Sequence, residues 1–138
     1  MIAIIQAQFN SVITSRLLDG SKKELKKNKI DFEVFEVPGV LEISYKAKKL
    51  IDSKKYDAII VLGCVIKGDT YHFEIVSNES ARAITELNLL GEIPVINGVL
   101  TCFDMEQAEK RSKGVNNKGI DFAKAALSMT NYGLRITD

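Results

Sequence analysis

The nine residues AIIVLGCVI, Ala58 to Ile66, form the longest nearly unbroken apolar run in the chain. Ile, Val and Leu stand at consecutive positions, as they do in a strand whose two faces are both buried. Such strands occur in parallel sheets that are covered by helices on both sides. A membrane-spanning helix would need about twenty apolar residues, so this run predicts a central strand instead.

Three other short segments rich in Ile and Val are also expected to be strands: Ile2 to Ala7, Phe32 to Val37, and Pro94 to Leu100. Between the strands, apolar residues recur with helical spacing over Val12 to Leu25, Ile43 to Ile51, and Ile75 to Leu87. Strands that alternate with helices indicate a parallel sheet with right-handed crossovers. We therefore expect an α/β fold over residues 1–138, a single-domain, flavodoxin-like three-layer sandwich with a four-stranded parallel sheet.

Two further helices are expected after the last strand. Asp104, followed three residues later by Gln107, approximates a capping box and marks a helix start. A final helix is predicted from about Asn116 to Met129, with Ile120, Ala123 and Leu127 as its buried stripe.

The charge balance argues against a nucleic-acid or membrane-surface partner. Lys and Arg total 19 against 18 Asp and Glu, a net charge of +1, whereas such proteins carry a basic excess on one face. The N-terminus has no basic n-region of a signal peptide. Cys64 and Cys102 lack metal-ligand spacing, and Cys64 should behave as a small buried hydrophobe. We expect a reduced, cytoplasmic protein without a metal.

The loop after Ile66 is the most informative candidate site, because ligands of open parallel sheets bind beyond the carboxyl ends of the strands. It contains Gly68, which allows close backbone approach, and Thr70, and it precedes a helix whose first N–H groups suit an anion. His72, the single histidine, follows and could transfer protons. Alone, these features are more typical of an ordinary strand-to-helix loop and of a capping or surface histidine than of a site.

Three other residues are weaker candidates. Phe9 follows the first strand and could stack on a flat heterocycle or plug the core. Glu42 follows the turn signal Val37-Pro38-Gly39 and could simply favour a helix start. Arg111 could bind a phosphate or lie in solvent.

Taken together, the motifs are far more specific. The ordered set AQFN, VPGVLE, YDAIIVLGCVIKGDTYHFEIVSNE, PVINGVLT, EQAEKR and NKG resembles the lumazine synthase family from about Ile2 to Met129. That family condenses 5-amino-6-(D-ribitylamino)uracil with 3,4-dihydroxy-2-butanone 4-phosphate to give 6,7-dimethyl-8-ribityllumazine, with loss of phosphate and water. The reaction belongs to riboflavin biosynthesis and uses no cofactor or metal.

The resemblance implies roles for individual residues. His72 corresponds to the proton-transfer residue, and Asn97 to a position that reaches into a neighbouring subunit's site. The ribitylaminouracil would contact Phe9, Val40, Leu41, Glu42, Cys64, Val65 and Ile66, with Phe9 stacking on the ring, Glu42 accepting from the ribityl hydroxyls, and Cys64 to Ile66 offering backbone groups. The butanone phosphate would contact Gly68, Asp69, Thr70 and Arg111.

The chain departs from the family pattern in places that bear on affinity and assembly. Leu41 replaces a frequent aromatic residue, and Asn97 replaces a frequent Phe. The stretch Arg111 to Gly119 looks one residue shorter, and the chain begins almost on the first strand. Family members form homopentamers, and in some cases a 60-subunit shell that uses these two regions, so we expect a pentamer rather than the shell. The resemblance also implies riboflavin synthase as a further partner.

Three alternatives compete with this interpretation. An archaeal-type riboflavin synthase shares the fold, but the GDTYHF and EQAEKR segments resemble the phosphate-handling enzyme. A non-catalytic flavin- or lumazine-binding module would not need both His72 and Arg111. A flavodoxin-like signalling domain would need an acidic cluster at the strand ends, which the sequence lacks.

Overall fold

The structure, a computed structural model, describes residues 1–130; residues 131–138 of the predicted single domain lie outside the described residues. The elements are β1 (Ile2–Ala7), α1 (Ser11–Lys27), β2 (Phe32–Val37), the 3-10 turn η1 (Val40–Glu42), α2 (Ile43–Asp52), β3 (Ala58–Ile66), α3 (His72–Leu89), β4 (Val95–Cys102), α4 (Met105–Lys110), the 3-10 turn η2 (Gly114–Asn116) and α5 (Lys118–Ser128). Among the described helices, none is long and apolar enough to span a membrane.

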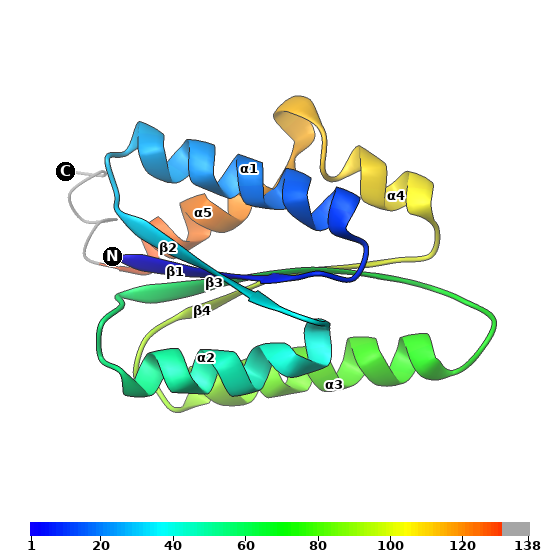
Figure 1. The fold of residues 1–138 in the computed structure, drawn as a ribbon, viewed down its shortest axis with the longest axis horizontal. Helices are drawn as coiled ribbons and strands as arrows, with labels where there is room; N and C mark the ends of the chain where they lie inside the picture. Colours follow the sequence, from blue (N-terminus) through cyan, green and yellow to red (C-terminus); the bar gives the residue numbers. More distant parts are fainter. Residues whose placement is uncertain (131–138) are drawn as a thin grey trace.

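The four strands form one parallel sheet in the order β2-β1-β3-β4. Helices α1 and α5 lie over one face of the sheet, and α2 and α3 lie over the other (Figure 1). The predicted α/β class with a four-stranded parallel sheet and three layers is therefore confirmed. Because all strands run the same way, their carboxyl ends meet at one edge of the sheet.

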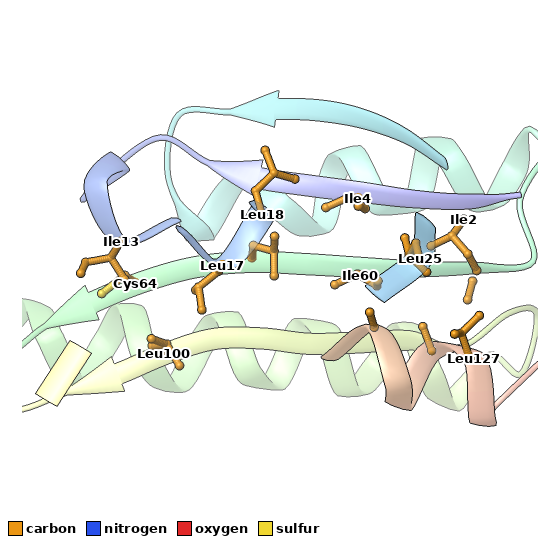
Figure 2. Close-up of a cluster of buried hydrophobic side chains, with 14 of the residues drawn as sticks. Ile2, Ile4, Ile13, Leu17, Leu18, Leu25, Ile60, Cys64, Leu100 and Leu127 are labelled. Carbon is orange, nitrogen blue, oxygen red and sulfur yellow. The ribbon is translucent and has the colours of Figure 1, made fainter. Parts of the chain in front are cut away.

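Alternation of side chains along the strands divides the core into two clusters. Ile4 and Ile60 point toward α1 and α5, where they meet Leu17 and Leu127 (Figure 2). The next residue on each strand points toward α2 and α3 instead. All six residues of β1 are buried, as the run of apolar residues requires for a central strand.

Four boundaries and one side chain differ from the sequence prediction. Strand β4 begins at Val95 rather than Pro94, and helix α5 ends at Ser128 rather than near Met129. Strand β4 continues to Cys102, two residues past the predicted end, because Thr101 and Cys102 still pair with Val65 and Ile66 of β3. Helix α5 begins at Lys118 rather than near Asn116. In α5, Ala123 and Leu127 are buried as predicted, but Ile120 is only half-buried.

Candidate active site

A pocket of about 290 Å³ lies at the carboxyl ends of the strands, and we call it the strand-end pocket. It collects residues from the end of β1, from η1, from the end of β3 and from the start of α3. Its lining consists of Phe9, Asn10, Gly39, Val40, Leu41, Glu42, Cys64, Val65, Ile66, Gly68, Thr70, His72, Phe73 and Val76. The wall is thus mainly apolar with a few polar groups, the usual character of a small-molecule site.

The end of β3 presents an unpaired backbone edge to this pocket. Pairing of β1 with β3 stops at Leu62, whereas β3 continues to Ile66 beside β4. Backbone groups alternate along a strand, and the Cys64 carbonyl accepts a hydrogen bond from the Asn10 side chain at 2.8 Å on the β1 side. The backbone N–H and C=O of Ile66 therefore point the same way, where a flat heterocycle with its own donors and acceptors could pair with them.

The loop between β3 and α3 supplies the polar end of the pocket. The backbone N–H of His72, the first residue of α3, donates to Thr70 Oγ1 at 3.3 Å. A Cβ placed on Gly68 would meet nothing within 4 Å, so the backbone there is open to approach. The imidazole of His72 is exposed and lines the same pocket as these anion-suited groups.

The opposite wall is formed by η1. Val40 is buried, and its Cγ1 lies 2.4 Å from the position that a Cβ on Gly63 would take. A side chain on β3 at this point would therefore push η1 out of place. Glu42, at the end of η1, is exposed and provides the one charged group among the lining residues, apart from any charge on His72.

A second pocket, of about 330 Å³, lies along the outer edge of β4, and we call it the edge pocket. Its lining consists of Asn97, Val99, Leu100, Thr101, Cys102, Arg111, Lys118, Asp121 and Phe122. Arg111 ends α4, and its guanidinium donates to the Gln107 carbonyl at 3.0 Å. Lys118 begins α5, 3.8 Å from the carboxylate of Asp121. The edge pocket therefore holds two exposed cations, whereas no Lys or Arg lines the strand-end pocket.

The structure divides the residues that the sequence singled out. The strand-end pocket unites Phe9, Val40, Leu41, Glu42, Cys64, Val65, Ile66, Gly68, Thr70 and His72. Asn97 and Arg111 line the edge pocket instead, and Asp69 lines neither. Two lining residues, Asn10 and Lys118, were not among the site residues predicted from the sequence, although they stand within the motifs AQFN and NKG.

The two cysteines, both free, are unsuited to nucleophilic chemistry. Burial, together with the nearby Cys102, raises the pKa of the Cys64 thiol to about 12. Burial also raises the pKa of Cys102, although the charge of Arg111 opposes that shift. Thiolates are therefore scarce at neutral pH. Within residues 1–130, no group of three or more His, Cys, Asp and Glu side chains is placed to hold a metal ion.

The sheet and its strand-end pocket define a flavodoxin-like α/β protein with a pocket of small-molecule size beyond the carboxyl ends of the strands. The model of the 6,7-dimethyl-8-ribityllumazine synthase family matches residues 1–133. The chain belongs to this family, whose members are transferases of riboflavin biosynthesis.

Relatives of this name resemble most of the chain. The protein from Thermotoga petrophila is 42% identical over 139 residues, which cover 98% of this chain and 84% of the relative. That from Parabacteroides distasonis is 44% identical over 135 residues, or 95% of this chain and 84% of the relative. The Thermotoga maritima protein is 41% identical with 98% and 84% coverage. These matches favour the synthase over the alternatives that the sequence left open.

Proposed function

We propose that residues 1–138 act as a single domain that condenses 5-amino-6-(D-ribitylamino)uracil with 3,4-dihydroxy-2-butanone 4-phosphate to give 6,7-dimethyl-8-ribityllumazine. The pyrimidine occupies the strand-end pocket. Phe9, which is 74% exposed, stacks on its ring, and the open backbone of Ile66 pairs with the uracil edge. Glu42 accepts hydrogen bonds from the ribityl hydroxyls, while Val40 and Leu41 contact the chain between them.

The second substrate binds beside the first, near the loop after β3. Its phosphate contacts the backbone at Gly68 and Asp69 and the hydroxyl of Thr70. The first N–H groups of α3, which lie next to this loop, also favour an anion. A dianionic phosphate is best matched by a cation such as the arginine fork. The cations, however, line the edge pocket and not the strand-end pocket.

We infer that the edge pocket of one subunit completes the strand-end pocket of its neighbour in a homopentamer. Arg111 and Lys118 then reach the phosphate from the neighbouring subunit, and Asn97 faces the pyrimidine with an amide where many family members have an aromatic ring. Phe9 and Leu41, which line the strand-end pocket, are exposed apolar side chains, as is Val12 at the start of α1. They support such a contact because the removal of apolar surface from water is favourable. Three expectations stay predictions: a pentamer rather than a 60-subunit shell, association with riboflavin synthase, and a cytoplasmic location.

The chemistry needs proton transfer and close approach. The ring amine attacks the ketone and water leaves, giving an imine; phosphate is then eliminated; the second amine closes the ring and a second water leaves. His72 lies among the groups that hold both substrates and relays the protons of these steps. Much of the acceleration comes from holding two reactive molecules together.

The direct test mixes purified protein with both substrates and follows the product by its fluorescence against a protein-free control. Acceleration well above the spontaneous reaction supports the proposed reaction. Absence of acceleration, with conversion of supplied lumazine to riboflavin, would favour the archaeal-type riboflavin synthase. Tight lumazine binding without turnover would favour the binding module.

A complementation experiment tests the shared site. His72→Ala disables the strand-end pocket and Arg111→Ala disables the edge pocket, so each homo-oligomer should be impaired at every site. After joint unfolding and refolding, mixed oligomers should contain some sites built from two intact halves, and activity should rise above the average of the two variants. Activity equal to that average would contradict a site shared between subunits.

A further inference from the structure

The two cations of the edge pocket stand at the two ends of a short connection between α4 and α5: Arg111 is the first residue of this segment, residues 111–117, and Lys118 follows it as the first residue of α5. Much of this segment is exposed, and Val115 at η2 is 95% exposed. Gly114 takes a φ of +58°, which suits a turn without a side chain. A cation on such a segment is useful only if other contacts fix its position.

One buried side chain at the end of this segment makes those contacts. Asn117 is 9% exposed, and its Nδ2 donates to the carbonyl of Arg16 in α1 at 2.8 Å. Its Oδ1 accepts from the N–H of Gly119 at 2.8 Å, which caps the start of α5. The carboxamide thus joins the start of α5 to α1, through two residues that are 101 positions apart in sequence.

Two glycines make room for this contact. A Cβ on Gly20 would lie 2.8 Å from Cγ of Asn117, so α1 leaves a slot for the amide. A Cβ on Gly119 would lie 2.0 Å from the Leu17 carbonyl oxygen, so α5 meets the backbone of α1 directly. The hydroxyl of Ser21, fully buried, donates to the Gly119 carbonyl at 2.8 Å and closes the same contact.

The contact is linked to both cations through the backbone. Lys118 follows Asn117 directly, and its N–H donates to the Arg111 carbonyl at 2.8 Å. Displacement of Asn117 would therefore move Lys118, and with it the backbone of Arg111. The geometry points to Asn117 as a positioning residue of the edge pocket: its amide, seated in the Gly20 slot, sets where Lys118 and Arg111 meet the substrate phosphate. This inference rests on the proposed function.

Asn117→Ser separates positioning from helix capping. Serine caps a helix about as well as asparagine but is too short to keep the Arg16 contact. We expect the KM for the butanone phosphate to rise roughly tenfold, since small displacements of a positioned group cost that much or more. The KM for the ribitylaminouracil should stay at the wild-type value, because the residues proposed to contact the pyrimidine stand in the strand-end pocket and, in the case of Asn97, on β4 rather than on the segment that Asn117 holds. Hydrogen exchange measured by mass spectrometry should quicken in residues 111–119.

Gly20→Ala approaches the same contact from α1, where the added methyl would displace the amide although alanine is the better helix former. The same selective rise in KM is expected. Asn116→Ser is the matched control, because Asn116 is the exposed neighbour in η2. It should leave both KM values and hydrogen exchange unchanged.

The outcomes separate this inference from the proposed function. Equal rises in both KM values, or faster exchange without a KM change, would mean that Asn117 is merely structural and would overturn the inference. An intact KM in Asn117→Ser beside a raised KM in Arg111→Ala would also overturn it while leaving the proposed function standing. A wild-type protein that accelerates nothing would overturn both.

Discussion

The substitution Gly63→Ala links the packing of β3 to the strand-end pocket. The added Cβ would lie 2.4 Å from Cγ1 of Val40 and 3.4 Å from Cγ2 of Val99. Carbon atoms pack at about 3.5 to 4.0 Å, so Val40 must move by at least about 1 Å while Val99 needs to move little. Val40 is β-branched and buried, so it cannot swing aside, and η1 must shift with it.

Overpacking of this size should lower the free energy of unfolding by about 2 kcal/mol. The shift of η1 also moves Leu41 and Glu42, so the KM for the ribitylaminouracil should rise, whereas the KM for the butanone phosphate should change little. Urea denaturation followed by circular dichroism measures the first quantity, and steady-state kinetics measures the second.

A double-mutant cycle isolates the cause. Val40→Ala removes the Cγ1 atom, so Gly63→Ala should cost about 1 kcal/mol less in that background than in the wild type, since residues in contact couple by such amounts. Equal costs in the two backgrounds would refute the argument that Val40 is what the new methyl meets.

Four further results are expected. His72→Ala should lower kcat on the order of a hundredfold without abolishing turnover, because proximity remains after the proton relay is lost; full activity in steady-state assays would remove His72 from the mechanism. Arg111→Lys should raise the KM for the butanone phosphate, since lysine lacks the planar fork, and an unchanged KM would place the phosphate elsewhere. The raised pKa of Cys64, about 12, should leave the native thiol unreactive toward a disulfide reagent at pH 8 until urea is added. Because the unfolded thiol loses its proton near its ordinary pKa and the folded one does not, stability should fall as pH rises from about 9 toward 12. Urea midpoints at two alkaline pH values should show a smaller fall in Cys64→Ala, and an identical fall would contradict a buried, protonated thiol.

Much of the fold was readable from local pattern. The bounds of β1, β2 and β3 agree with the prediction to the residue. Strands β1 and β3 are buried on both faces and are mainly apolar runs whose ends are visible, whereas the half-buried β2 is a short segment rich in Phe and Val that ends before Pro38. Strand β4 was less clear, since Thr101 interrupts its apolar run and only pairing with Val65 extends the strand past it. The loop motif GDTYHF likewise placed Gly68, Thr70 and His72 at one pocket, because they are close in sequence and follow one strand.

Only the tertiary structure separated the remaining candidates. Arg111 and Asn97 were grouped with the other site residues by family resemblance, yet they line a different pocket, on the outer edge of β4. The contact of Asn10 with Cys64 and that of Asn117 with Arg16 span 54 and 101 residues, and no local periodicity encodes them. Local sequence pattern was enough to predict the strands, the layers and the residue types of the β3 loop, because these depend on neighbouring residues and on burial. Which side chains share a pocket was decided by the tertiary structure, because that depends on where distant segments of the chain meet.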